Sequence, residues 1–472
     1  MTSEITSIAD VDIAVIGGGI VGCAVARRMT LEGASVVLVE KSADILAGAS
    51  KGNSAILHTG FDAPNDSLEH ECIQNGYDEY LKIHESLNLP LLKTGALLVA
   101  WTESEEEQFS KILKKAQHNK VNDLQLLSKK ELLQREPNLA ENARTAIEVP
   151  REFVIDPWSA PLAYLSQAIV NGCQTSFNTE ITGGDFDGDK WALHTNTPDN
   201  KKGVIKAKHI INSAGLYGDI LEQNVLGECE FTIKPRKGEF VVFDKPAHDL
   251  VKNIILPIPT EITKGVVIFP TIFGNLAVGP TADEQEGRAD ASVNQKNLEM
   301  LYDLAIEKVP ALKNVRVNAT YAGIRPATER SEYRVRHLSQ KNWITLGGIR
   351  STGLTASLGI AQHVQKLFTE QGIMFDKLST PLAHSVPNIA EHLPRDWQKA
   401  GYDEIVCHCE LATKREIIAA LNSTLPAGDL SGLKRRTRAT MGRCQGFYCS
   451  ARLDELTEGK FVDSISVGKC DE

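Results

Sequence analysis

Three features typical of membrane-spanning, secreted or nucleic-acid-binding proteins are missing from this sequence of 472 residues. No uninterrupted apolar run approaches the roughly 20 residues needed to cross a bilayer. Residues 1–10 lack the basic start and the apolar centre of a signal peptide. Positive charge is outnumbered, because 51 Lys and Arg stand against 61 Asp and Glu, which argues against a nucleic-acid partner. We therefore expect a cytoplasmic protein, with peripheral attachment to a membrane left open.

Internal repeats and low-complexity segments are absent too, so the sequence does not indicate a repeat protein. The length allows two or three domains with large cores. The nine cysteines are spread unevenly, and four of them crowd between residues 407 and 449. Cys470 is expected to be a bystander. The other four are expected to be buried cytosolic thiols, namely Cys23, Cys72, Cys173 and Cys229.

Residues 12–40 are the stretch around which the rest of the chain is organised. An apolar run, a G-x-G-x-x-G turn, a helix-length segment, a second β-branched run and a terminal acid together predict one βαβ unit. Gly17 permits the tight turn, Gly19 lets the backbone approach a pyrophosphate, and Gly22 allows the helix to pack closely on the strand. Glu40 would hold a pair of ribose hydroxyls. The unit predicts dinucleotide binding, with an ordinary βα turn as the alternative, and leaves both FAD and a nicotinamide open.

Further along the chain, other stretches extend the predicted ligand site. Residues 47–54 are small and polar, which suits backbone lying close to a flat or phosphorylated ligand, although a solvent loop would look similar. His58 could contact the reactive ring of that ligand or be a hydrogen-bonded core histidine. A β-rich run over residues 205–211 leads into Gly215, where the end of a sheet strand would leave room for the cofactor.

The middle of the chain changes character. Residues 231–325 alternate between strands and turns and include a predicted hairpin over residues 265–280, as expected for an antiparallel sheet that roofs a cofactor. A helix is predicted from residue 353 to about residue 368, with Thr352 or Thr355 as its cap. Its first N–H groups would again face an anion or a carbonyl-rich ring.

The order of these motifs resembles the FAD-dependent oxidoreductases that include glycerol-3-phosphate dehydrogenase and L-2-hydroxyglutarate dehydrogenase, a D-amino-acid-oxidase-like family. The resemblance covers about residues 10–370 and implies that the cofactor is FAD. The matching stretches are Gly17-x-Gly19-x-x-Gly22 with Glu40, Asn53–Gly60, Asn212–Gly215, Pro235–Phe240, Pro270–Thr281, Tyr321–Pro326 and Gly353–Ser357. The implied cofactor contacts are Gly17, Gly19, Gly22, Glu40, Lys41, Ser50, Asn53, Ser54, Ile181, Gly215, Gly353, Leu354 and Thr355.

Removal of a hydride from an alcohol requires a base near the hydroxyl and a clamp for the anionic end of the substrate. His58 is the predicted base. Arg325 is the predicted clamp and Arg350 the second choice, because a guanidinium can hold a carboxylate or a phosphate in bidentate fashion. Arg330 and Lys264 are weaker candidates that surface salt bridges would explain equally well. Arg350 also departs from the family pattern, in which the 2-hydroxyglutarate enzymes have an acid here, and favours a more anionic or differently placed substrate.

The C-terminal cysteines resemble the [2Fe-2S] domain of bacterioferritin-associated ferredoxin, which also extends anaerobic glycerol-3-phosphate dehydrogenase. A helix opened by a capping box at Thr413 and Glu416 belongs to this pattern. The resemblance implies four thiolate ligands for the cluster, with structural zinc as the rival; they are Cys407, Cys409, Cys444 and Cys449. The basic run of this region could offset an anionic cluster, dock an acidic partner or form only a solvated helix face; it comprises Lys434, Arg435, Arg436, Arg438 and Arg443.

The predicted fold class is α/β: a discontinuous Rossmann-like FAD-binding domain with an inserted antiparallel-sheet substrate domain of α+β type, plus a small helical iron–sulfur domain. The oxidoreductase part is expected over residues 10–375. Its FAD domain would take about residues 10–80, 150–225 and 335–375, and its substrate domain about residues 81–149 and 226–334. A linker over 376–402 and the [2Fe-2S] domain over 403–472 would follow.

The predicted function is an FAD-dependent dehydrogenase that oxidises a small anionic hydroxy compound, such as L-2-hydroxyglutarate or glycerol 3-phosphate, by hydride transfer to FAD. Electrons would pass through the [2Fe-2S] cluster to an external acceptor, a quinone or an electron-transfer protein, with partner subunits as a further expectation. Two alternatives stay open. One is an amine or amino-acid dehydrogenase subunit of the same fold, and the other is an electron-transfer flavoprotein without an organic substrate of its own.

Overall fold

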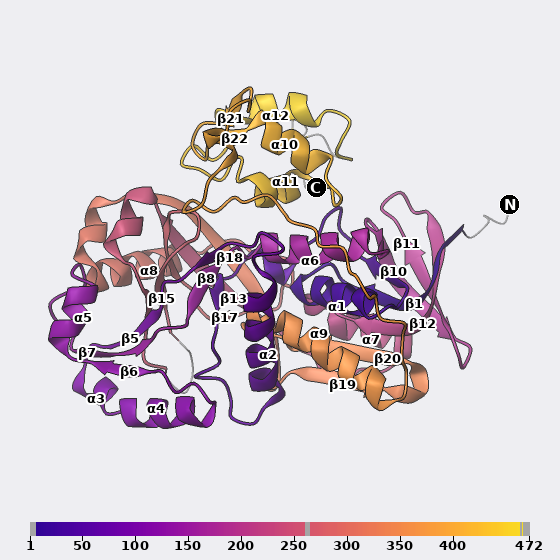
Figure 1. The fold of residues 1–472 in the computed structure, drawn as a ribbon, viewed down its shortest axis with the longest axis horizontal. Helices are drawn as coiled ribbons and strands as arrows, with labels where there is room; N and C mark the ends of the chain where they lie inside the picture. The colour runs from indigo at the N-terminus through magenta and orange to yellow at the C-terminus, as the bar shows by residue number, and fades with distance from the viewer. Residues whose placement is uncertain (1–5, 260–264, 463–464, 466–472) are drawn as a thin grey trace.

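The computed structural model describes residues 6–259, 265–462 and 465, so Lys264 and Cys470 lie outside the described residues. Figure 1 shows two large lobes side by side, with a smaller C-terminal part resting above them. Each large lobe is built on a sheet of its own. No helix of the described part is long and apolar enough to cross a membrane.

The first lobe contains an eight-stranded sheet. Its strands are β1 (Thr6–Ile16), β2 (Val36–Val39), β9 (Gln174–Ser176), β10 (Glu180–Phe186), β11 (Trp191–Asn196), β12 (Lys202–Asn212), β19 (Arg334–Leu338) and β20 (Trp343–Gly347). The centre is parallel, with β1 between β2 and β12, whereas β10, β11 and β19 add antiparallel pairs. All four residues of β2 are buried, as expected for a strand that is covered on both faces.

Helices cover this sheet and close the first core. They are α1 (Ile20–Leu31), α2 (Leu68–Ile83), α6 (Ser159–Val170), α7 (Gly218–Leu226) and α9 (Gly353–Glu370). α1 contacts both α6 and α9, and α2 packs along α9. The core between them is mostly apolar, with Ile13, Cys23, Leu38 and Val364 all buried. The first βαβ unit is therefore anchored on three sides, which fixes the turn between β1 and α1.

The second lobe contains a nine-stranded sheet that is mostly antiparallel. Its strands are β5 (Ala96–Ala100), β6 (Gln125–Leu127), β7 (Thr145–Val149), β13 (Ile233–Phe243), β14 (Ile254–Leu256), β15 (Val267–Pro270), β16 (Leu276–Gly279), β17 (Asp283–Glu284) and β18 (Val317–Thr328). β15 and β16 form the hairpin that the sequence predicts. The lobe also carries α3 (Glu103–Glu106), α4 (Phe109–His118), α5 (Lys129–Arg135) and α8 (Gln295–Lys308). The fold class expected from the sequence is confirmed.

A small third sheet lies at the junction of the lobes. β8 (Phe153–Ile155) is its middle strand and pairs with β3 (Ile56–Leu57) and β4 (Leu91–Leu92). Because β3 and β8 run antiparallel, the residues that flank them, His58 and Glu152, come face to face.

The prediction that a threonine caps α9 is confirmed for the position of Thr352 and wrong for the capping hydrogen bond. Thr352 occupies the cap position, but its side chain makes no capping hydrogen bond. Its hydroxyl instead donates to Glu69 Oε1 at 2.8 Å. The Thr355 hydroxyl accepts the backbone N–H of His58 at 3.0 Å and donates to the carbonyl of Ile56 at 3.2 Å. Both threonines tie α9 to neighbouring segments, so the first turn of α9 is left open.

After α9 the chain crosses the molecule as an extended strap and enters the C-terminal part (Figure 1). Val386 and Glu391 of this strap donate backbone hydrogen bonds to the carbonyls of Leu87 and Ile272. The C-terminal part consists of β21 (Ile405–Cys407), β22 (Ala412–Thr413), α10 (Lys414–Leu421), α11 (Leu430–Thr437) and α12 (Ser450–Thr457). The capping box predicted at α10 is confirmed, with both hydrogen bonds between Thr413 and Glu416 present.

Candidate functional site

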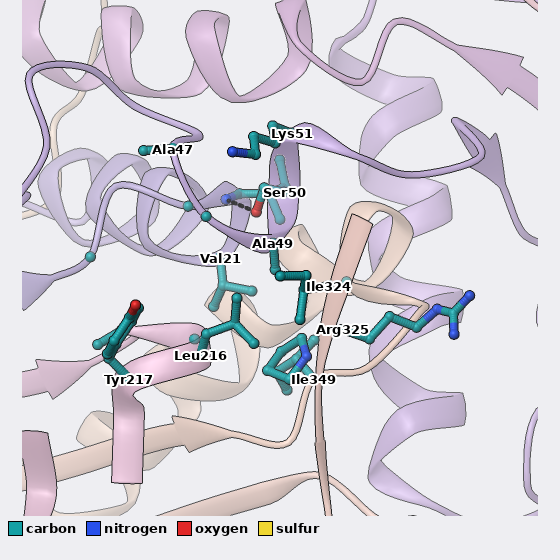
Figure 2. Close-up of a pocket in the computed structure, with 18 of the residues that line it drawn as sticks. Val21, Ala47, Ala49, Ser50, Lys51, Leu216, Tyr217, Ile324, Arg325 and Ile349 are labelled. Carbon is teal, nitrogen blue, oxygen red and sulfur yellow. Dashed lines mark hydrogen bonds between the residues drawn. The ribbon is translucent and has the colours of Figure 1, made fainter. Parts of the chain in front are cut away.

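A cavity of about 420 Å³ lies where the two lobes meet. Its walls come from segments that are far apart in the sequence. The first lobe supplies the turn after β1, residues 40–42 and 47–54, and the residues that follow β12 and β20. The second lobe supplies β18 and parts of β13. Figure 2 shows side chains from both lobes, among them Ser50, Leu216 and Ile324, gathered around this space.

The glycines of the turn have separate physical duties. Gly17 has a φ of +110°, and a Cβ there would lie 2.6 Å from the carbonyl oxygen of Ser213. A Cβ at Gly22 would lie 1.9 Å from the carbonyl oxygen of Gly17, so only glycine lets α1 start this close to β1. Gly19 is the N-cap of α1 and lines the cavity without a side chain. The first turn of α1 contains no acidic residue, so its N–H groups and its dipole favour an anion.

Two side chains complete this end of the cavity. Glu40 accepts hydrogen bonds from the backbone N–H of Gly18 at 2.6 Å and of Ser42 at 2.9 Å, which fixes its carboxylate at the cavity wall. The Ser50 hydroxyl accepts the N–H of Ile20 at 3.1 Å, the dashed bond in Figure 2, and joins the small-residue loop to α1. A carboxylate beside a helix N-terminus is the arrangement that holds the ribose and pyrophosphate of a dinucleotide.

Most of the residues predicted to contact the cofactor line this cavity. They are Gly17, Gly19, Glu40, Lys41, Ser50, Asn53, Ser54, Ile181, Gly215, Gly353 and Leu354. Gly22 and Thr355 are not part of its lining and act through packing and hydrogen bonds behind it. Arg325 and Arg350 belong to the lining, whereas His58 does not.

Other lining residues were missed by sequence reasoning. Tyr217 lies under Lys41, whose Nζ is 3.3 Å from the ring centroid. Arg288 donates to both carboxylate oxygens of Asp219 and to the carbonyl of Leu216, which fastens the loop after β17 over the cavity. No local pattern marks these residues, because Tyr217 and Lys41 are far apart in the sequence and Arg288 meets Asp219 only where the two lobes come together.

Arg325 extends from β18 and is the least compensated of the three arginines that line the cavity. Its Nη2 donates to the carbonyl of Thr281 at 2.9 Å, and it forms no ion pair with any residue in the described ranges. Burial lowers the pKa of Arg325 to about 10, so the guanidinium is still protonated at neutral pH. Figure 2 shows it pointing away from the apolar side chains of Leu216 and Ile349. An anion in this part of the cavity would gain a charge-assisted hydrogen bond.

Arg350 is already partly neutralised. Its Nη2 lies 3.7 Å from Glu69 Oε2, and its side chain is 29% exposed. Glu69 comes from α2 and also accepts the Thr352 hydroxyl. The family pattern has an acid at the position of Arg350. Here the acid beside this position is Glu69, which comes from α2.

His58 is oriented by a buried carboxylate. His58 Nδ1 lies 2.8 Å from Glu152 Oε2, and the Glu152 side chain is 1% exposed. The other oxygen of Glu152 accepts the backbone N–H and the hydroxyl of Thr59. Because a carboxylate only accepts hydrogen bonds, His58 donates Nδ1–H to Glu152, and Nε2 is the ring nitrogen left for another partner. Glu152 lies 94 residues from His58, so the sequence contained no sign of the pair.

The four C-terminal cysteines come together as two neighbouring pairs, Cys409 with Cys444 and Cys407 with Cys449. Within the described ranges, no three His, Cys, Asp or Glu side chains converge as they would around a single metal ion. Backbone N–H groups of Tyr448, Gly446 and Phe447 lower the pKa of the Cys444 thiol. Four thiols in two pairs, with amides directed at a sulfur, are a donor set that suits a [2Fe-2S] cluster.

The basic run of the C-terminal part is mostly buried and contacts its own chain. Arg435, Arg436 and Arg438 are each less than 9% exposed. Arg436 pairs with Asp44 of the first lobe, and Arg438 pairs with Glu410 while its guanidinium lies 4.2 Å from the Phe273 ring centroid. A solvated helix face is therefore wrong for these three residues. They dock the C-terminal part onto both lobes.

Comparisons with known proteins agree with this arrangement. The chain matches the family model for FAD dependent oxidoreductases over residues 12–367 and that for the BFD-like [2Fe-2S] binding domain over residues 405–458. It is 29% identical over 454 residues to a glycerol 3-phosphate dehydrogenase of Caloramator mitchellensis, which covers 94% of this chain and 93% of that protein. A glycerol 3-phosphate oxidase of Mycoplasma pneumoniae is 31% identical over 75% of this chain and 94% of its own.

Solved structures give the same result. The L-alpha-glycerophosphate oxidase of Mycoplasma pneumoniae with FAD bound superposes with a TM-score of 0.73 at 28% identity, covering 81% of this chain and all of that one. A glycine oxidase of Bacillus cereus, at 22% identity and a TM-score of 0.68 over 77% of this chain and 98% of that one, shows the shared fold. The match to the BFD-like domain favours the cluster over zinc for the four thiols. The chain therefore belongs to the FAD-dependent oxidoreductases, as an FAD enzyme that carries a C-terminal [2Fe-2S] domain.

Proposed function

We propose that the protein is a dehydrogenase for a small anionic hydroxy compound, with glycerol 3-phosphate as the first candidate and a 2-hydroxyacid such as L-2-hydroxyglutarate as the second. The observation that carries this proposal is Arg325, a cation in the wall of the cofactor cavity without a carboxylate partner among the described residues. A phosphate or carboxylate would supply that partner. The glycerol 3-phosphate dehydrogenase that aligns over almost the whole chain supports the first candidate.

His58 is the group that we assign to take the hydroxyl proton of the substrate. Its ring is held by Glu152, and its backbone N–H by Thr355 of α9, next to the cavity-lining Gly353 and Leu354. FAD, once bound, supplies the acceptor for the hydride. Arg325 would hold the anionic end of the substrate and so fix which carbon faces the cofactor.

A [2Fe-2S] domain on a substrate-oxidising flavoprotein implies an electron acceptor outside the chain. A cluster passes electrons singly, which a hydrolase or a simple oxidase would not need. We propose that the acceptor is a quinone or an electron-transfer protein, reached alone or with partner subunits. Function in the cytoplasm, with peripheral attachment to a membrane, stays a prediction.

The test is an anaerobic absorption experiment on the protein with both cofactors. Glycerol 3-phosphate, 2-hydroxyacids, amino acids and amines are added singly while the flavin and cluster bands are recorded. We expect glycerol 3-phosphate to bleach the flavin, and the cluster bands to fall with it. Bleaching by amino compounds alone would overturn the proposed reaction, and no bleaching by any compound would support a flavoprotein that only relays electrons.

A further inference from the structure

One loop of the first lobe belongs to the FAD cavity at both of its ends. Residues 40–42 and 47–54 line the cavity, whereas the residues between them, 43–46, do not. Within this middle part the backbone N–H of Leu46 donates to the carbonyl of Gly18 at 3.0 Å. The N–H of Gly18 in turn donates to Glu40. Gly18 of the glycine turn, Glu40 and Leu46 of the loop are thus joined by hydrogen bonds into one unit.

The C-terminal domain contacts the middle of this loop, residues 43–46, through hydrogen bonds and an ion pair. Arg436 of α11 donates to both oxygens of Asp44, at 2.6 and 2.8 Å. The exposed fractions of the two side chains are 5% for Arg436 and 1% for Asp44, so the ion pair is shielded from water. Arg435 donates to the carbonyl of Ile45 at 2.9 Å, and the N–H of Gly428 donates to Asp44 Oδ2 at 3.1 Å.

The two surfaces fit so closely that glycine is needed on the α11 side. A Cβ at Gly428 would lie 1.9 Å from the carbonyl oxygen of Ala43. A Cβ at Gly432 would lie 1.7 Å from Asp44 Oδ2. Neither glycine has a positive φ, so it is space, not backbone conformation, that requires glycine at both positions.

We propose that α11 is part of the FAD site: by holding Asp44, the iron–sulfur domain positions the loop whose two ends line the FAD cavity. Removing the Arg436 guanidinium would leave a buried carboxylate unpaired, which is far more costly than losing a surface pair. Asp44 would then move towards water and carry the loop with it. Because such coupling is reciprocal, bound FAD must also stabilise the docking of α11.

Another reading is that the loop is held by its own apolar anchors. Ile45 and Leu46 are buried in the core of the first lobe. If they suffice, the C-terminal domain rests on a loop that is already rigid, and FAD binding is independent of α11. The two readings differ in what a change on α11 does to FAD affinity.

The decisive variant is Gly432→Ala in the full-length protein. Alanine raises the helix propensity of α11 and keeps both charges of the ion pair, but its Cβ pushes against Asp44. We expect the FAD dissociation constant, measured from the fluorescence of released flavin, to rise by about tenfold, as it should also in Arg436→Met. The matched control is Asp244→Asn, which removes the ion pair between Asp244 and Arg443, a contact of the C-terminal domain that bypasses the loop. It should leave FAD affinity unchanged.

Hydrogen exchange provides the second measurement. In the wild-type protein with its cluster, stripping FAD should speed exchange of the amides of residues 430–437, and adding FAD back should slow it. The cluster absorption bands show that the C-terminal domain of each variant is folded. If a variant loses these bands, it is replaced in the test by Asp44→Asn, which breaks the same ion pair from the loop side. Unchanged FAD affinity in Gly432→Ala and Arg436→Met, or exchange in α11 that ignores FAD, would overturn the proposal.

Discussion

Three arginines line the FAD cavity, and what distinguishes them is their partners. Arg288 pairs with Asp219. Arg350 shares its charge with Glu69, whereas Arg325 donates only to a backbone carbonyl. The sequence analysis ranked Arg325 first and Arg350 second as the clamp, because a guanidinium can hold an anion in bidentate fashion. The partners seen in the structure favour the same order, since a guanidinium without an ion pair among the described residues has more to gain from an anionic ligand.

Arg325→Met should therefore raise the KM for an anionic substrate by about tenfold to a hundredfold, the cost of a lost charged hydrogen bond. The flavin spectrum and the FAD affinity should not change. KM is measured from flavin bleaching under anaerobic conditions. Arg350→Met is the matched control and should have the smaller effect, and an equal or larger one would contradict the assignment of the clamp.

Glu152→Gln should lower kcat by about a hundredfold or more, the scale of general base catalysis. A glutamine amide can donate to His58 Nδ1 and so leave the proton on Nε2, where the base is needed. The pH profile of kcat/KM should lose the limb that reports this base. Arg151→Gln serves as control, because Arg151 pairs with Asp123 at the surface. A wild-type profile in Glu152→Gln would show that the pair is only structural.

At the scale of elements, the chain order of strands and helices was predictable where a pattern is local. The glycine turn, the β15–β16 hairpin and the capping box of α10 follow from neighbouring residues. The cap of α9 was not predictable, since Thr352 and Thr355 are used by α2 and by the β3 segment. Each threonine hydroxyl donates its hydrogen bond to the acceptor that tertiary packing places beside it, Glu69 for Thr352 and the carbonyl of Ile56 for Thr355.

The joint between α5 and β14 gives a pH-dependent test of stability. Glu136 ends α5 and accepts the backbone N–H groups of Lys252 and Asn253. Its burial raises the pKa to about 7 from 4.5. The folded protein therefore holds this proton more tightly than the unfolded chain, so stability falls as the pH rises from about 4.5 to about 7, and the full cost is present above that.

Glu136→Gln removes this cost. The free energy of unfolding of the variant, relative to wild type, should increase between pH 5 and pH 8 by up to about 3 kcal/mol. Denaturant unfolding at each pH measures it. Glu141→Gln changes an exposed glutamate in the segment that follows α5 and should show no such trend. A difference that is flat with pH would mean that Glu136 titrates normally.

For the whole molecule, the structure places the iron–sulfur domain against both lobes of the oxidoreductase (Figure 1). Cys444→Ala should abolish the cluster absorption, because it removes one of the four thiols. With FAD added in excess, so that a weaker FAD affinity is compensated, the substrate should still bleach the flavin at a rate close to that of wild type. A reductive titration should then consume one electron equivalent fewer per chain. Unchanged electron uptake would contradict the assignment of Cys444 as a ligand.

The sequence alone determined that a dinucleotide and a thiolate-bound metal centre were expected, because a glycine turn with its acid and four closely spaced cysteines are local patterns; the resemblance to known families, and not the spacing, indicated FAD and a [2Fe-2S] cluster. It also placed Arg325 at the site. Tertiary structure decided which charges meet: Glu152 reaches His58 across 94 residues, Glu69 neutralises Arg350, and Asp44 meets Arg436 across 392 residues. Burial and long-range packing set these pairs, and neither is encoded in any short stretch of the chain.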